Sequence, residues 1–449
     1  MKMVLSFMAL AAFLSWAGMA GAQEISIQDE IRQLKARLEV LEEKVAYQEK
    51  CIDDQKKCIL DQNDKIAKYE ARFEKFDTEL HRQTGSPIEI AKGLEIGAGA
   101  TMIVQGSNNT NVAGEEKRDR TDVSYSADIT IGKEFEEVGG KAFLHLESGQ
   151  GQTLEDDLIL YSNVNRDADD ENQVHLTEIW YEQALLDDKA VLTFGKIDPS
   201  AYFDNNDVAN DETTQFLGRI FRNSPTIEFP DNGAGIRAAY MPKDWVELGL
   251  AVFDGDSDWG EIGDNLFEIG QVMLKTKFGG QPGNYRFLGW FSNANHARWL
   301  DASLASEAAY GFGLSFDQKI NDIVTLFTRY GWQDPSVYNP EITTTDGRFY
   351  SLEQSWSAGF QIEGKPWGRE KDIFAFAVGQ AVPSSDYRRS ASSLRAKTEG
   401  HLEAYYNIHI NDHLRISPDF QYIWNPFGKD VVADTAGIFV GGMRAQIDF

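Results

Sequence analysis

The chain of 449 residues has little cysteine, fewer basic than acidic residues and few long apolar runs. Its 71 acidic residues exceed its 43 basic ones, which gives a formal net charge of −28 and excludes a broad nucleic-acid-binding surface. Beyond residue 22, no stretch offers the ~20 apolar residues that a transmembrane helix needs. The length fits one large domain plus an accessory element.

The only cysteines are Cys51 and Cys58, in a chain whose start indicates export. They stand seven residues apart, about 10 Å along a helix, which is too far for a disulfide within one helix. They either crosslink chains or stay free, and we favour free thiols.

Residues 1–22 have the pattern of a secretory signal peptide. Lys2 supplies the positive charge, an apolar core follows, and Ala20-Gly21-Ala22 forms an A-x-A cleavage site before Gln23. An N-terminal membrane anchor is the alternative, but the Ala-x-Ala sequence stands where cleavage would occur. We therefore expect the mature chain to be exported.

Residues 23–82 predict a coiled-coil stalk. Apolar residues recur at steps of four and three from Ile27 to Phe76, which is typical of a left-handed coiled coil. The a positions are Ile31, Leu38, Val45, Ile52, Ile59, Ile66 and Phe73, and the d positions are Ile27, Leu34, Leu41, Gln48, Gln55, Gln62, Tyr69 and Phe76. Isoleucine at a without leucine at d favours a trimer over a dimer. The alternative is an amphipathic helix folded back on the rest of the chain.

After a linker at 83–92, the hydrophobic period becomes two and remains so through 93–449. Residues 123–131, 352–362 and 414–424 alternate between apolar and polar side chains, and Leu352 and Trp356 are assigned to one apolar face. Short turns alternate with long polar connections. The pattern accommodates sixteen candidate strands from about Leu94 to Phe449. Their spacing of roughly 22 residues suits strands that cross a bilayer at a tilt.

Two architectures contain such strands. A soluble β-sandwich buries its apolar face against a second sheet, whereas an outer-membrane barrel turns that face to lipid and carries its long loops at one rim. The signal peptide, the even strand number and the unequal connections favour the barrel. The chain ends within a strand, with Phe449 and Ile447 on its apolar face, and a closed barrel must pair its last strand with its first. We predict an all-β transmembrane barrel of 16 antiparallel strands, preceded by the α-helical stalk, with Phe449 at the periplasmic interface.

The connection after the fifth strand, residues 198–233, is too long for an ordinary hairpin loop. It offers acceptors, guanidinium donors and aromatic faces, the mixture that sugar recognition needs. The candidate constriction residues are Asp204, Asn206, Asp207, Asn210, Asp211, Glu212, Arg219 and Arg222. The alternative is a hydrogen-bonded loop that only braces the barrel wall.

The stretch "FGKIDPSAYFDNNDVANDETTQFLGRIFRNSP" resembles the carbohydrate-selective porins of the OprB family. Further resemblances are "RYGW" at 329–332, "PWGREKD" at 366–372, "EAYYNIHI" at 403–410 and "ISPDFQYIWNP" at 416–426. The resemblance covers the barrel and implies a sixteen-stranded porin, trimers, passive sugar diffusion and a loop after strand five that sets the constriction. The coiled coil departs from the family and leaves the substrate class open, because anion-selective porins can also carry one.

Alternation assigns a further set of charged side chains to the lumen. They are Asp128, Glu178, Glu182, Arg329, Glu353, Glu403, Arg415 and Asp419.

His409 and His413 could share a metal on a helix, but here they flank a strand turn. Residues 204–212 could bind calcium, although they lack the spacing of an EF-hand loop. We therefore expect neither a metal nor another cofactor.

The sequence predicts an outer-membrane porin for passive diffusion of small hydrophilic solutes, carbohydrates first, with its stalk in the periplasm and no enzymatic activity. The expected partners are outer-membrane lipid, two further copies of the chain, small sugars and, through the stalk, peptidoglycan. The alternatives are an anion- or siderophore-type channel, a barrel enzyme with a Ser–His pair, and a tether between the outer membrane and the cell wall.

Overall fold

The protein is described by a computed structural model, whose chain divides into two compact units, residues 1–91 and 92–449. The structure describes residues 92–449 except 113–118, 152–153, 168–172, 262, 302, 394 and 432–435, together with 32, 35, 38, 52, 56 and 57. Those six residues are helical. The rest of the predicted signal peptide, stalk and linker, with Cys51 and Cys58, lies outside the described residues. Within the described part of the chain, no helix is both long and apolar enough to cross a membrane.

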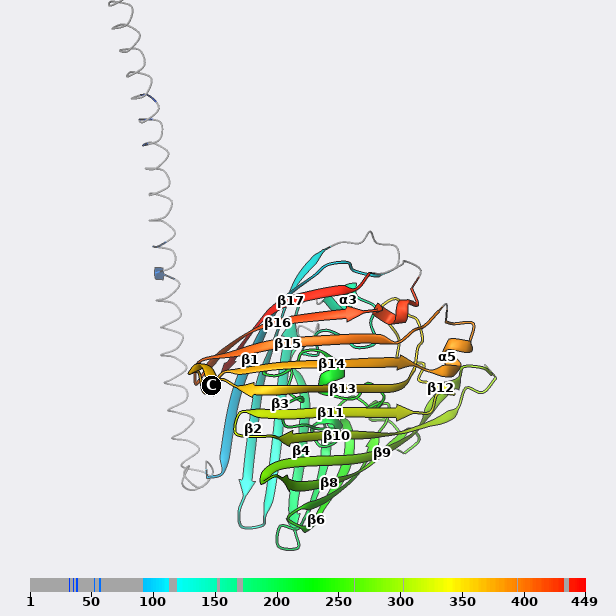
Figure 1. Cartoon of the computed structure of the whole chain (residues 1–449). Coiled ribbons are helices and arrows are strands. Elements are labelled where there is room, and N and C mark those ends of the chain that lie inside the picture. Colours follow the sequence, from blue (N-terminus) through cyan, green and yellow to red (C-terminus); the bar gives the residue numbers. More distant parts are fainter. Residues whose placement is uncertain are drawn as a thin grey trace, which may run out of the picture. The chain divides into compact units, whose positions relative to one another are not determined.

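The second unit is a closed antiparallel barrel of sixteen strands (Figure 1), as the hydrophobic period predicts. The strands are β1 (Leu94–Ser107), β2 (Arg120–Phe135), β3 (Gly140–Gln150), β4 (His175–Leu185), β5 (Ala190–Ile197), β6 (Gly233–Lys243), β7 (Val246–Asp254), β8 (Leu266–Phe278), β9 (Gln281–Arg298), β10 (Glu307–Lys319), β11 (Val324–Gln333), β13 (Leu352–Glu363), β14 (Ile373–Pro383), β15 (Glu399–Asn411), β16 (Leu414–Trp424) and β17 (Ile438–Asp448). A short strand β12 (Val337–Tyr338) pairs with the end of β9 in a separate sheet.

The last strand pairs with the first, as predicted. The β17–β1 register runs from Gly99 opposite Asp448 to Ser107 opposite Val440. The Phe449 amide then donates to the Ala98 carbonyl at 2.9 Å. Closure satisfies the backbone polar groups that an open edge would leave unpaired in lipid.

The outer face of the barrel is apolar and rich in aromatic side chains. On β17, Phe439, Met443 and Ile447 are exposed, as is Phe449 directly after it, whereas Arg444 is buried inside. The same period-two exposure recurs on β7, where Leu248, Leu250 and Val252 face outward. Because the alternation holds over consecutive strands, the exposed face is the surface that lipid covers.

Short turns join the strands at one rim and long loops at the other, which for such barrels are the periplasmic and extracellular rims. The loops carry the short helices α3 (Leu154–Asp157), η1 (Pro199–Ala201), α4 (Arg219–Arg222), α5 (Ser385–Arg389) and η3 (Pro426–Lys429), while η2 (Lys365–Trp367) lies in a turn. The second loop (residues 151–174) and the third loop (residues 198–232) both pack against inward-facing strand residues.

Candidate functional site

A polar cavity of about 880 Å³ lies between the third loop and the inner wall formed by β2 to β5. On the loop side it is lined by Asp211, Glu212, Arg219 and Arg222, and the second loop adds Arg166. Cations on these two loops therefore share one water-accessible space with the carboxylates of the strand wall.

The two arginines of α4 have different surroundings. Arg222 forms an ion pair with Glu212 and donates to Ser200 Oγ at 3.3 Å and to Asn223 Oδ1 at 2.8 Å. Burial lowers the pKa of Arg222, but the carboxylates of Glu212 and Asp198 outweigh it and leave that pKa raised. The Arg219 carbonyl accepts from the Asn223 amide at 2.9 Å, but its guanidinium makes no hydrogen bond or ion pair with any other residue that the structure describes, so those donors are available to a solute.

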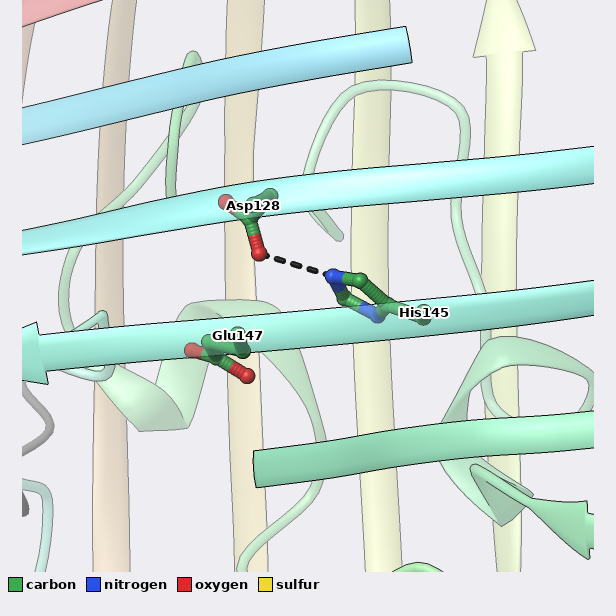
Figure 2. Close-up of side chains that lie close together, drawn as sticks. All are labelled: Asp128, His145 and Glu147. Atoms are coloured by element: carbon green, nitrogen blue, oxygen red, sulfur yellow. Dashed lines mark hydrogen bonds and ion pairs between the residues drawn. The ribbon is translucent and has the colours of Figure 1, made fainter. Parts of the chain in front are cut away.

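The strand wall opposite carries a cluster of titratable side chains. Asp128 of β2 and His145 and Glu147 of β3 lie together, with His145 Nε2 2.7 Å from Asp128 Oδ1 (Figure 2). Glu178 of β4 approaches His145 Nδ1 at 3.9 Å and accepts from the Trp180 indole at 3.1 Å. This wall is predominantly acidic, whereas the loops opposite contribute the arginines.

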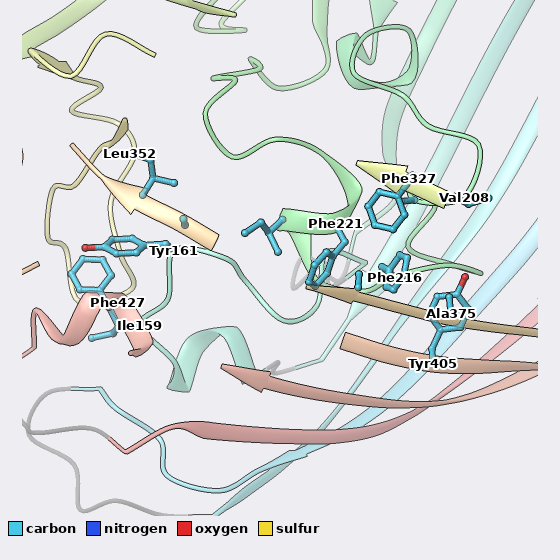
Figure 3. Close-up of a cluster of buried hydrophobic side chains, with 14 of the residues drawn as sticks. Ile159, Tyr161, Val208, Phe216, Phe221, Phe327, Leu352, Ala375, Tyr405 and Phe427 are labelled. Atoms are coloured by element: carbon cyan, nitrogen blue, oxygen red, sulfur yellow. The ribbon is translucent and has the colours of Figure 1, made fainter. Parts of the chain in front are cut away.

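Apolar packing holds the third loop inside the barrel. Phe216 and Phe221 are fully buried beside Phe327 of β11 and Tyr405 of β15 (Figure 3). The Phe216 ring meets Tyr405 edge-on at 5.0 Å between centroids. The inner faces of these strands are therefore partly apolar, because they pack against a loop as well as face water.

Hydrogen bonds to strand carboxylates fix the same loop. The Glu403 carboxylate of β15 accepts from the backbone amides of Leu217 at 2.6 Å and Gly218 at 2.9 Å, directly before α4. Asp204 lies 3.4 Å from Arg329 of β11, whose guanidinium also donates to the Asp204 and Phe221 carbonyls. Burial raises the pKa of Asp204, against the opposing influence of Arg329. These contacts place α4 and its arginines at a defined position in the lumen.

The structure separates the sequence-predicted site residues into two groups. Those that line the cavity are Asp128, Glu178, Asn210, Asp211, Glu212, Arg219 and Arg222. Those that do not are Asp204, Asn206, Asp207, Glu182, Arg329, Glu353, Glu403, Arg415 and Asp419.

The second group has structural contacts instead. Asp204, Asn206, Arg329, Glu403 and Asp419 are buried between loop and wall. The remaining four have partners elsewhere: Asp207 accepts from Asn284 of β9, Glu182 accepts from Thr193, Glu353 accepts from the Ser385 amide and Arg415 lies 3.6 Å from Asp448. Alternation does not show where a loop covers the inner face of a strand.

Sequence reasoning missed Arg166, His145 and Glu147 in the cavity lining. His145 and Glu147 stand two residues apart on one face of β3, a signal that period-two reading could have used. Arg166 lies in the irregular second loop, and no local pattern in the sequence indicates that this loop enters the lumen.

Comparison with known proteins gives one family and several similar folds. Residues 113–449 match the family described as carbohydrate-selective porin, OprB family. Among solved structures, OprB of Pseudomonas putida at high pH matches with a TM-score of 0.66 at 16% identity, over 82% of this chain and 97% of that chain. The outer membrane channel DcaP of Acinetobacter baumannii matches with a TM-score of 0.48 at 10% identity, over 80% of this chain and 98% of that chain. No curated protein sequence matches.

A closed sixteen-stranded barrel with an inward-folded third loop and a polar cavity defines a porin, an outer-membrane channel for small solutes. This chain belongs to the carbohydrate-selective porin family, OprB, whose match extends over well more than half of its length. The family and the fold are those of bacterial outer-membrane channels.

Proposed function

We propose that the protein lets small carbohydrates diffuse passively across the outer membrane through the cavity beside the third loop. The available Arg219 guanidinium, opposite a carboxylate-rich wall, is the observation that carries this proposal. Arginine donors pair with ring hydroxyls, and carboxylates accept from them. Phe229, which also lines the cavity, supplies an apolar face for the C–H surface of a sugar. Weak binding of this kind lets a solute enter and leave.

An anion- or siderophore-type channel fits the cavity less well. Its lining includes Asp128, Glu147, Glu178 and Asp211, and a ladder of basic residues would be needed to favour anions. The acidic wall instead suits neutral polyhydroxylated solutes or cations.

No catalytic step is part of the proposal. The structure does bring a serine and a histidine together, Ser162 Oγ and His401 Nδ1 at 2.9 Å, but both residues are 0% exposed. The other imidazole nitrogen faces the Gln421 amide oxygen at 3.0 Å, where a hydrolase would place a carboxylate. A nucleophile that no substrate can reach has a structural role, here in joining the second loop to β15.

Planar-bilayer recording of the purified full chain tests the carbohydrate proposal. A panel of sugars should block the single-channel current in a saturable way, and Arg219→Gln should raise the half-blocking concentration about tenfold. A hydrogen bond to a charged group contributes about 1.5–3 kcal/mol to binding, and about 1.4 kcal/mol changes a dissociation constant tenfold. Arg388→Gln is the matched control, because Arg388 is an exposed arginine of α5 outside the cavity. Open channels that no sugar blocks would contradict the proposal.

We further propose that the chain assembles as a trimer with its N-terminal stalk in the periplasm, where the stalk contacts peptidoglycan. In support, Leu38 and Ile52, both assigned to the apolar seam, are 58% and 49% exposed in the single chain. Association with other copies of the chain would cover them. Crosslinking of the purified protein followed by mass determination tests the trimer.

A further inference from the structure

The acidic wall of the cavity holds an arrangement that sugar diffusion does not require. Asp128 stands directly opposite Glu147 in the β2–β3 register, and His145 stands directly opposite Glu178 in the β3–β4 register. Three strands therefore bring three carboxylates around one imidazole, on the face that lines the cavity, and Figure 2 shows two of them, Asp128 and Glu147, beside His145.

A bulge in the sheet sharpens this arrangement. The β3–β4 register shifts between His145 and Leu146, so that Glu147 stands opposite His175, where a regular ladder would place Leu176. Bulges of this kind redirect side chains and recur next to functional sites. Thr177, beside the bulge, donates its hydroxyl to Glu147 Oε2 at 3.4 Å.

The distances suit ligation of one ion. One ligand atom from each of Asp128, His145 and Glu147 lies within 4.8 Å of the others. Ligand atoms about 2.1 Å from a shared tetrahedral ion lie roughly 3.4 Å apart, so His145 Nε2 and Asp128 Oδ1, now hydrogen-bonded at 2.7 Å, need to separate by only a fraction of an ångström to hold one. A His–Asp ion pair alone would account for one carboxylate, but it gives no reason to gather Glu147 and Glu178 at the same imidazole.

The ligand types select the class of ion. Imidazole nitrogen suits zinc, nickel, copper and iron, whereas an oxygen-only site would suit calcium or magnesium. Three carboxylates around one imidazole also leave excess negative charge, which a divalent cation would offset.

We propose that Asp128, His145 and Glu147, with Glu178 beside them, bind a divalent first-row transition-metal ion in the channel wall. The bound ion faces the cavity, opposite the arginines of α4. Occupancy removes most of the negative charge of this wall, so it lowers the cation preference of the channel.

Isothermal titration of the detergent-purified full chain with zinc chloride is the first test. We expect one Zn²⁺ per chain, at least tenfold weaker binding in both His145→Asn and Glu147→Gln, and no competition from equimolar Mg²⁺. The control is the double variant His409→Asn/His413→Asn, which removes the imidazoles at the β15–β16 turn and should bind zinc as the wild type does. Each variant is compared only after its heat-modifiable gel shift shows a folded barrel.

Binding that the turn variant abolishes, or that His145→Asn leaves unchanged, would overturn the proposal, as would absence of binding. A measurement on the unaltered protein guards against variants that do not fold. Zinc X-ray absorption should show nitrogen ligation together with at least two oxygen ligands at about 2.0–2.2 Å, and an oxygen-only shell would reject the site. In a salt gradient, micromolar zinc should also shift the reversal potential toward lower cation selectivity.

Discussion

At the scale of single residues, Gly218 lies where the third loop packs closely against β15. A Cβ at this residue would lie 2.9 Å from Glu403 Oε2 and 3.0 Å from His401 Cε1. Its φ of −67° is ordinary, so space and not backbone conformation requires glycine here. The residue before α4 is therefore small because the Glu403 carboxylate has to reach two backbone amides.

Gly218→Ala should loosen the third loop. The added methyl group pushes the Glu403 carboxylate away from the Leu217 and Gly218 amides, and overpacking of this kind costs about 1–3 kcal/mol. We expect a lower midpoint of thermal unfolding in detergent and greater open-channel current noise. Gly441→Ala is the matched control, because a Cβ at Gly441 of β17 meets nothing within 4 Å. Equal behaviour of the two variants would contradict this account.

For single residues, the sequence predicted which face of a strand most side chains occupy, but it did not predict what those side chains pack against. Period-two alternation correctly placed Ile447 and Phe449 on the outer face. It placed Leu352 on the lipid face, yet a register shift between Leu352 and Gln354 turns this side chain into the interior cluster, where it is 2% exposed. A bulge depends on the partner strand, so the local pattern cannot reveal it.

At the scale of elements, the second loop is fixed by a partly buried carboxyl group. Glu155 of α3 accepts from the backbone amides of Val164 and Asn165. Burial raises the pKa of Glu155 from 4.5 to about 7, while those two amides and Arg166 work in the opposite direction. Burial also raises the pKa of Asp167 in the same loop, with Glu212 adding to the effect.

These shifts predict a second loop that docks less stably as the pH rises. A carboxyl group whose pKa is higher in the folded state contributes nothing below about pH 4.5, and its ionisation costs increasing free energy up to about pH 7. For Glu155 the cost is at most about 3 kcal/mol, at about 1.36 kcal/mol per pKa unit. Hydrogen exchange of the Val164 and Asn165 amides, corrected for intrinsic pH dependence, should therefore show less protection at pH 8 than at pH 5. Glu155→Gln should reduce that difference, and an unchanged difference would exclude Glu155 as its source.

Element boundaries followed from the sequence where turns and periods were regular. The connection after the fifth strand was predicted at residues 198–233, and in the structure β5 ends at Ile197 and β6 begins at Gly233. The entry of the second loop into the barrel was not predicted, because its contacts depend on distant partners. Leu154 and Leu158 pack against Ile423 of β16, more than 250 residues further along the chain.

At the scale of the whole molecule, the stalk and the barrel should be separable in function. Deleting residues 23–82 while keeping residues 1–22 should leave single-channel conductance unchanged, because the strands and both inward loops lie in the second unit. The same deletion should reduce co-sedimentation of the protein with purified peptidoglycan by at least severalfold. Undiminished co-sedimentation would argue against contact between the stalk and peptidoglycan. A changed conductance would show that the channel depends on the stalk.

The barrel itself was predictable because lipid imposes a strict rule on every strand. Each crossing must alternate, and the ring must close, so the period-two pattern predicted the architecture, and the pairing of β17 with β1 closes the ring. The residues that line the cavity were harder to predict from the sequence, because the lining depends on which side chains the second and third loops leave uncovered.

The seam of the barrel has a consequence for the order of assembly. Ile438 and Val440 of β17 are buried against Leu154, Leu158 and Val164 of the second loop, and β17 also pairs with β1. The loop therefore gains the last part of its apolar cover only when the final strand arrives. A nascent barrel that lacks β17 would expose this cluster to water. Pairing of β17 with β1 and packing of the second loop against β17 therefore form a single cooperative event.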